Sequence, residues 1–175
     1  MSDTGGGWLI SFRVGGAEAA LPLGIVREVT ARPLITRVPG SHPFVTGIAL
    51  RGGVALPVYD LVRFGPLWSG PRPAPAEESA GGPEHVIVCD WGEARLGLLG
   101  DRADLLEAEQ PENASGGAQV GRCRMSAEYV SEVLRRGDEA IILLDPGRLF
   151  ASLGVPAAEP PDAREGGSED DPARR

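Results

Sequence analysis

The stretch that decides the fold runs from Phe44 to Phe64 and reads Phe44-Val-Thr-Gly-Ile-Ala-Leu-Arg-Gly-Gly-Val-Ala-Leu-Pro-Val-Tyr-Asp-Leu-Val-Arg-Phe64. Two short apolar runs, 47–50 and 54–59, flank the triplet Arg51-Gly52-Gly53. Because Gly-Gly tolerates positive φ, the pattern predicts a tight β-hairpin. Pro57 cannot donate a ladder hydrogen bond, so we expect its strand at a sheet edge or near a bulge. A protruding Arg51 at the bend suits a docking surface better than a catalytic site.

Length and composition limit the class of protein. A chain of 175 residues makes one domain, or two small subdomains that share a core. Aromatic residues are only 5% of the chain, so Val, Leu, Ile and Ala must fill most of the core. The formal net charge of -8 argues against nucleic acid or an anionic membrane as the main partner. The 25 Gly and 16 Pro favour many short strands over long helices.

The cysteines and the termini point to a cytoplasmic protein. Cys89 and Cys123 lack zinc or redox spacing, so we expect two reduced thiols. Residues 1–7 are polar and glycine-rich, without the basic and apolar regions of a signal peptide. No apolar run approaches the roughly 20 residues that span a bilayer. We therefore expect no direct membrane insertion, and any membrane association would come through a partner.

The first half of the chain reads as short strands. Trp8 to Val14 alternates between apolar and polar residues, which predicts a half-buried strand. A second strand is predicted from Ala19 to Leu23. Ile25 to Val29 fits either a helical turn or a strand, and its pattern does not separate them. Residues 32–39 predict another short extended piece, because residues that precede proline avoid the α region.

The second half of the chain also reads as short strands, after a segment of different composition. Residues 65–83 hold five prolines with Gly, Ser and Glu between them, which predicts a linker or mobile loop. His85 to Trp91 and Ala94 to Gly100 predict two strands joined by a turn at Gly92-Glu93. The extended pattern continues over 103–108, and the polar residues 109–121 predict a loop.

Residues 125–144 leave two alternatives open. Apolar residues from Tyr129 to Leu134 sit at helical spacing, which favours a short helix. The same residues could form a hairpin with 139–144, turning at Arg136-Gly137-Asp138. Asp145-Pro146 then predicts the capped start of a last helix over 147–153. The chain beyond has almost nothing to bury and is predicted to be disordered.

These patterns predict an all-β protein built as two small β-barrels. The expected organisation is a disordered N-terminus over 1–7, a main domain over 8–153 and a disordered acidic tail over 154–175. Within the main domain we expect subdomains at about 8–65 and 84–153, joined by a proline-rich linker over 66–83.

No catalytic or metal-binding constellation is evident in the sequence. The two histidines, His42 and His85, have no partner at metal-ligand spacing, and each is expected to be a surface or loop residue. Four aspartates end apolar runs and are expected to cap turns or helices; they are Asp60, Asp90, Asp101 and Asp145. Residues 5–7 precede a strand and so form no phosphate loop. We expect no enzyme, no metal and no cofactor, which leaves binding as the function.

The order of these features resembles the CheW-like family, the coupling proteins of bacterial chemotaxis arrays. The resemblance covers about residues 8–153. It rests on six segments in register, which are Trp8–Val14, Ala20–Val29 with its Val-Arg-Glu-Val ending, Val38–Ile48 with Val-Pro and Phe-Val-Thr-Gly-Ile, Val54–Leu61, Leu96–Asp101 and Ala140–Asp145.

The resemblance implies a fold, partners and a binding groove. The family fold is two SH3-like, five-stranded β-barrels around a shared core, and it favours the hairpin over 129–144. Members do no chemistry; they bridge the cytoplasmic tips of chemoreceptors to the histidine kinase CheA and join its regulatory domain into rings. The receptor tip docks in an apolar groove between the barrels. By resemblance, the groove residues are Val26, Glu28, Val38, Phe44, Gly47, Arg51 and Gly52.

The hairpin bend departs from the family pattern Gly-x-x-Asn-Leu-Arg-Gly. With Gly47 and Pro57 in register, Leu50 replaces the Asn, and Gly52 replaces the Arg. Either the turn has slipped by one residue, or the receptor-facing Arg is lost. The alternative function is therefore a divergent module that binds the kinase or another regulator without ordinary receptor coupling. We expect Arg51 to lie in solvent beside Glu28.

Overall fold

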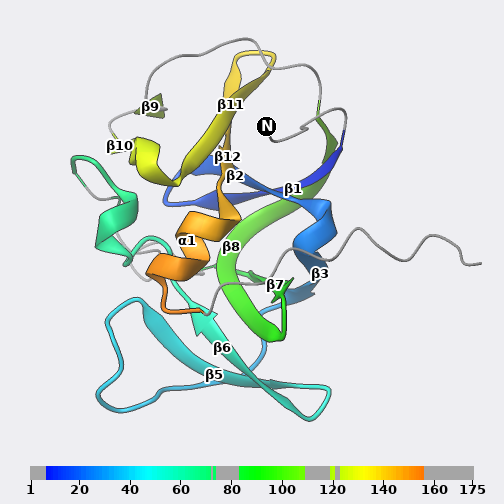
Figure 1. The fold of residues 1–175 in the computed structure, drawn as a ribbon, viewed down its shortest axis with the longest axis vertical. Helices are drawn as coiled ribbons and strands as arrows, with labels where there is room; N and C mark the ends of the chain where they lie inside the picture. Colours follow the sequence, from blue (N-terminus) through cyan, green and yellow to red (C-terminus); the bar gives the residue numbers. More distant parts are fainter. Residues whose placement is uncertain (1–6, 72, 74–82, 109–118, 121–122, 156–175) are drawn as a thin grey trace, which may run out of the picture.

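The computed structural model describes residues 7–71, 73, 83–108, 119–120 and 123–155. Ten strands form one continuous, strongly curved sheet that folds into two lobes, and β9 (Gln119–Val120) pairs separately with β10 (Cys123–Arg124). The one α-helix among the described residues, α1 (Pro146–Ser152), lies across the middle of the molecule in Figure 1. The all-β prediction is confirmed. None of the described helices is long and apolar enough to cross a membrane.

The two lobes share the long strand β8 (Ala94–Glu107). The first lobe contains β3 (Val26–Ala31), β4 (Ile35–Thr36), β5 (Val45–Arg51), β6 (Val54–Tyr59), β7 (His85–Trp91) and the start of β8. The second lobe contains β1 (Trp8–Val14), β2 (Ala17–Pro22), β11 (Val130–Arg136), β12 (Glu139–Leu144) and the end of β8. In Figure 1, the β5–β6 hairpin forms the bottom of the molecule and the β11–β12 hairpin forms the top.

The lobes do not correspond to the two halves of the sequence. The N-terminal strand β2 runs parallel to β12, with Ala19 opposite Ile142, so the start and the end of the domain share a lobe. Conversely, β3 from the first half pairs with β7 from the second. The expected subdomains over 8–65 and 84–153 therefore need revision, because long-range pairing groups the strands across the proline-rich segment.

Strand β8 passes from one lobe to the other at a bulge. Its first part pairs with β7 as far as Gly100, and its second part pairs with β1 from Asp101 onward. Arg102 has a φ of 47°, and the register with β1 shifts at this point. Since a left-handed residue bends a strand, the bulge lets two predicted extended segments form one strand that serves both lobes.

The β5–β6 hairpin forms as the sequence predicts. Arg51 pairs with Val54, so Gly52 and Gly53 alone make the turn, with φ values of 56° and 78°. Both values lie where glycine is strongly favoured, as a two-residue hairpin turn requires. Pro57 faces Ile48 on β5, and the parallel pairing of β6 with β8 begins only at Val58. The missing N–H of Pro57 therefore costs no ladder hydrogen bond to β8.

The predicted linker begins later than residue 66. Leu67, in the short 3-10 helix η2 (Gly65–Leu67), is fully buried, and the Trp68 indole donates to the Leu61 carbonyl at 3.0 Å. The backbone of Ser126 donates to Leu67 at 2.7 Å, which ties this segment to the second half. Two large apolar side chains thus anchor the start of the proline-rich segment in the core. Residues 72 and 74–82 lie outside the described residues.

The structure decides the open alternatives. Residues 129–144 form the β11–β12 hairpin, turning at Gly137-Asp138, so the helix alternative is wrong. Residues 23–29 contain both a 3-10 turn, η1 (Leu23–Ile25), and the start of β3. Another 3-10 turn, η4 (Ala127–Tyr129), precedes β11. Asp145 caps α1 by accepting from the Arg148 N–H at 3.1 Å, as predicted.

The ends of the chain follow the predictions only in part. Val155 is buried in the main core, so the predicted tail over 154–175 begins too early. The packed domain includes Val155, and its backbone donates to Phe150 at 2.9 Å. The predictions of disorder for 1–6 and 156–175, and of a loop for most of 109–121, fall outside the described residues.

The main core lies where the lobes meet α1. Phe12 from β1, Leu98 from β8 and Phe150 from α1 are all fully buried in one cluster that draws on both lobes. Gly100 allows this packing, because a Cβ there would come within 2.8 Å of the Phe12 ring. The shared core holds the two lobes together and fixes the surface that lies between their strands.

Candidate docking surface

The candidate site is built around an ion pair between two strands that share no ladder. Arg51 ends β5 at the hairpin turn, and Glu28 lies on β3. The Arg51 Nε donates to Glu28 Oε1 and its Nη2 donates to Glu28 Oε2, each at 2.9 Å. This two-point geometry fixes the guanidinium more firmly than a single contact would. Both side chains remain partly exposed, at 44% and 34% of their surface.

The pairing changes the acidity of both groups. Hydrogen bonding to the Arg51 guanidinium holds the pKa of Glu28 below its ordinary value of 4.5, although desolvation opposes the shift. The same contact raises the pKa of Arg51. Both groups are therefore charged at neutral pH, and the pair presents fixed donors and acceptors to solvent. The expectation that Arg51 lies in solvent beside Glu28 is confirmed.

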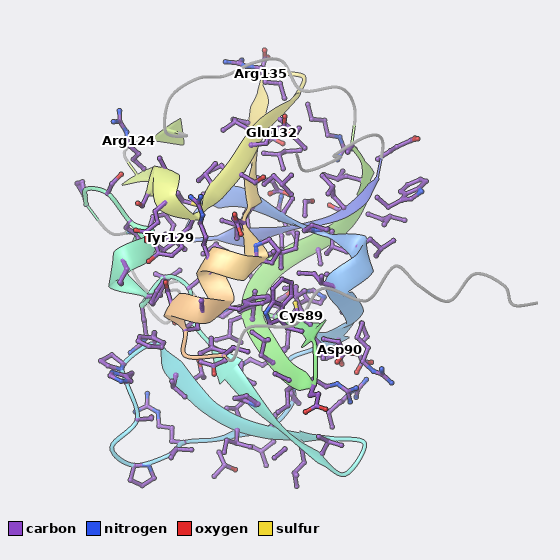
Figure 2. The ribbon with its side chains drawn as sticks, in the orientation of Figure 1. Cys89, Asp90, Arg124, Tyr129, Glu132 and Arg135 are labelled. Carbon is purple, nitrogen blue, oxygen red and sulfur yellow. The ribbon has the colours of Figure 1, made fainter. Side chains whose placement is uncertain are left out.

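A second ionic cluster lies beside this pair. Asp90 on β7 faces Arg95 on β8 across the ladder, and the Arg95 Nε donates to Asp90 Oδ1 at 2.6 Å. Arg27 on β3 donates to the other carboxylate oxygen at 3.2 Å. Hydrogen bonding to Arg95 and then to Arg27 lowers the pKa of Asp90. Figure 2 shows Asp90 at the end of β7, on the far side of the molecule from Arg135.

The two clusters are electrostatically continuous. Arg27 and Arg95 both lower the pKa of Glu28 through space. We call the five residues the charged rim; they are Arg27, Glu28, Arg51, Asp90 and Arg95. The rim holds three positive and two negative groups, so it can recognise a partner by charge and register. The sequence reasoning missed Asp90 and Arg95, although the predicted hairpin at Gly92-Glu93 would have placed them opposite each other.

The structure does not gather the other predicted groove residues around this rim. Val26 is half-buried and packs on the main core. Val38 lies at the other end of β5, where it lines a separate groove. Gly52 belongs to the turn beside Arg51, and it has open space around it. The predicted set therefore divides into residues at the rim, Val38 at a separate groove, and Val26 on the core.

Phe44 and Gly47 are packed tightly against neighbouring residues of the first lobe. The Phe44 ring stacks on His42 and packs edge-on against Phe64, which belongs to the main core. Gly47 has a φ of 149°, and a Cβ there would collide with the Thr36 carbonyl oxygen. Both residues hold the β4–β5 region in place, and neither presents a side chain at the rim.

The remaining ionisable groups do not assemble into a reactive centre within the described ranges. No group of three His, Cys, Asp or Glu side chains there could hold a metal ion. Asp60 accepts from the Val62 N–H at 2.9 Å and so binds turn backbone as predicted. Asp101 lies within β8 and accepts from the distant Glu84 N–H at 2.8 Å, so the prediction that it caps a turn is wrong. Burial raises the pKa of the Cys89 thiol to about 12, which keeps it protonated. The prediction of a turn cap is also wrong for Asp90, which forms ion pairs with Arg95 and Arg27.

Comparison with known proteins agrees with this architecture. The model of the family described as "CheW-like domain" matches residues 9–154. The chemotaxis protein CheW of Klebsiella aerogenes is 26% identical over 156 residues, which cover 86% of this chain and 85% of that protein. The chemotaxis protein CheW of Treponema pallidum is 26% identical over 149 residues, or 82% of each chain.

A solved structure shows the same fold. The crystal structure of the scaffolding protein TtCheW from Thermoanaerobacter tengcongensis superposes with a TM-score of 0.63 at 19% identity. The match covers 85% of this chain and 90% of that one. The two proteins therefore share a curved all-β fold. The chain belongs to the CheW-like family and is a non-catalytic scaffold of the chemotaxis type.

Proposed function

We propose that this protein is a cytoplasmic adaptor that couples the signalling tip of a chemoreceptor to a CheA-type histidine kinase. The observation that carries the proposal is the two-point ion pair between Arg51 and Glu28. It supports the first of the two alternatives for the bend, a turn that has slipped by one residue, because an arginine is still held on Glu28. Family membership of residues 9–154 supports the choice of partners.

The surroundings of the ion pair suit a helical partner. Val54, the cross-strand partner of Arg51 in the hairpin, is a large apolar side chain with an exposed fraction of 47%. Apolar contacts of this kind supply affinity, while the charged rim fixes orientation and register. A receptor tip is an α-helical bundle, which can offer both apolar and charged residues to such a surface.

The test is the affinity for a receptor tip in nanodiscs. Arg51→Ala and Glu28→Ala should each weaken binding by about tenfold or more, as for a charged residue at the centre of an interface. Arg135→Ala is the matched control, because it removes an arginine from the opposite hairpin. The exchange Arg51→Glu with Glu28→Arg should restore part of the affinity. Wild-type affinity in both single alanine variants would contradict the receptor-facing role.

Kinase binding is a separate arm of the same test. A pull-down with the regulatory domain of the cognate kinase should succeed for the wild type and for both rim variants. If the wild-type protein binds the kinase but not the receptor, the divergent module is favoured over the coupling adaptor. Binding to neither partner would refute both forms of the proposal.

A further inference from the structure

A groove of about 430 Å³ lies at the end of the first lobe that is remote from the Arg51 turn. The segment 37–43 and the first residues of β5 line the groove, together with Arg32, Pro83 and Leu99. Arg51 ends the same strand that begins at this groove, so the groove and the charged rim are separate surfaces. The coupling function proposed above makes no use of this groove.

The groove carries positive charge that is not neutralised. Three arginines and one aspartate line it, which gives a net charge of +2 in a chain whose formal charge is -8. Asp60 is already engaged, because Arg63 lies 3.2 Å from one of its carboxylate oxygens. Arg32 and Arg37 are exposed, and neither guanidinium has a side-chain partner within the described part of the chain. Two arginines are thus available to an anionic group.

A polar atom inside the groove also lacks a partner. Thr46 lines the groove at the point where the β5–β6 register shifts between Val45 and Gly47. Its Oγ1 is buried and makes no hydrogen bond to any described residue. A buried hydroxyl without a partner is costly. The two exposed guanidinium groups fit a carboxylate-bearing segment.

The chain itself contains a segment of this chemistry. Residues 159–171 hold six acidic residues and one arginine, which gives a net charge of -5, and three of the acids are consecutive as Glu169-Asp170-Asp171. The proline-rich segment offers only the pair Glu77-Glu78. The charge density of residues 159–171 therefore complements the groove better than that of the proline-rich segment.

The tether has enough length to reach the groove. The last described residue, Val155, is buried in the same cluster as Leu61, Val62 and Phe64, and these residues flank Arg63 in the chain. The 14 residues from there to Glu169 span up to roughly 45–50 Å when extended. A short tether of this kind gives an effective concentration in the millimolar range, so even weak contacts can be populated.

We propose that the groove formed by Arg32, Arg37 and Thr46 binds the carboxylates of residues 159–171 of the same chain. The contacts are charge-assisted hydrogen bonds at the surface, so each is weak and salt weakens it further. The complex forms in cis and depends on the tether. An acidic peptide of another protein would have to compete with this segment for the same arginines.

The experiment places a nitroxide label on the acidic segment of the full chain. Ser168→Cys provides the attachment point in a Cys123→Ser background, because Cys89 is buried and does not take up the label. Amide signals of residues 37–46 should lose intensity by about twofold or more at low salt, and should recover it in 1 M NaCl, where the Debye length is about 3 Å. The amide spectrum also reports whether each variant is folded.

Paired variants decide the outcome. Arg32→Gln with Arg37→Gln should abolish the broadening, whereas Arg135→Gln with Arg136→Gln, the same charge change on β11, should leave it unchanged. Glu169→Gln, Asp170→Asn and Asp171→Asn together should also abolish it. Broadening that survives the Arg32 and Arg37 changes, or that falls elsewhere on the protein, would overturn the proposal. The proposal would also be overturned if Glu77→Gln with Glu78→Gln shifted the amide signals of the groove while the changes at 169–171 did not.

Discussion

Arg51 and Glu28 lie 23 positions apart in the chain, and the Arg51 guanidinium donates to both Glu28 carboxylate oxygens at 2.9 Å. Strands β3 and β5 share no ladder, because β3 pairs with β7 whereas β5 pairs with β4 and β6. The ion pair therefore bridges two strands of the first lobe that backbone hydrogen bonds leave unconnected. Its loss should change the position of the hairpin tip as well as remove charge.

The Arg51 contact should determine the pKa of Glu28. In Arg51→Gln, the Glu28 pKa should rise toward its ordinary value of 4.5, because the largest cause of its depression is removed. Since the folded-state pKa is lowered, the pair stabilises the fold above pH 4.5, and this contribution disappears as the pH falls through the lowered value. NMR titration of the Glu28 side-chain carbon measures the shift. An unchanged pKa would show that the contact is absent in solution.

Trp68 should be essential to stability, although it lies in a proline-rich segment. Trp68→Ala should lower the free energy of unfolding by about 3–5 kcal/mol, because it removes a buried indole and its hydrogen bond to Leu61. Trp8 is 51% exposed, so Trp8→Ala is the matched control and should cost far less. Urea denaturation followed by circular dichroism compares the two. Equal losses would contradict the packed position of Trp68.

Gly47 should tolerate no side chain. Gly47→Ala places a Cβ against the Thr36 carbonyl and forces alanine into a φ region that costs about 1–3 kcal/mol by itself. Gly24 has open space around it and no positive φ, so Gly24→Ala provides the control. Thermal unfolding should show a clear decrease in Tm for the first variant only. Wild-type stability of Gly47→Ala would mean that β4 and β5 are farther apart than described.

Cys89 should resist thiol reagents in the native protein. Its thiol is fully buried and its pKa is raised to about 12, so almost no thiolate exists at pH 8. In a Cys123→Ser background, modification should occur only as fast as the protein unfolds, and urea should accelerate it. A Leu96→Ala variant opens a cavity beside the opposing strand and should increase the rate. Rapid labelling of the wild type without denaturant would contradict the burial.

Local patterns in the sequence predicted the elements well. Alternation over Trp8–Val14 and the Gly-Gly turn after Arg51 gave the correct strand and hairpin, because both depend on neighbouring residues. The hairpin over 129–144 needed the family resemblance. The apolar residues from Tyr129 to Leu134 also fit helical spacing. Only their pairing with Glu139–Leu144 shows that this segment is a strand.

Long-range relationships could not be predicted from local patterns. The parallel pairing of β2 with β12 joins residues over 120 positions apart, which is why the subdomain boundaries needed revision. Val38 and Glu28 were expected in one groove, but they lie at different ends of the first lobe. Asp90 was expected to cap a turn. Its ionic partners come from β3 and β8, so their identity depends on how two hairpins approach each other.

The continuity of β8 has a consequence for how the molecule responds to load. A single strand carries ladder hydrogen bonds to β7 on one side of the bulge and to β1 on the other. A partner that pulls on the β5–β6 end therefore strains a covalent backbone that leads directly into the opposite lobe. The molecule should behave mechanically as one stiff link, without a hinge between its lobes, and polypeptides cut at Arg102 should complement each other poorly.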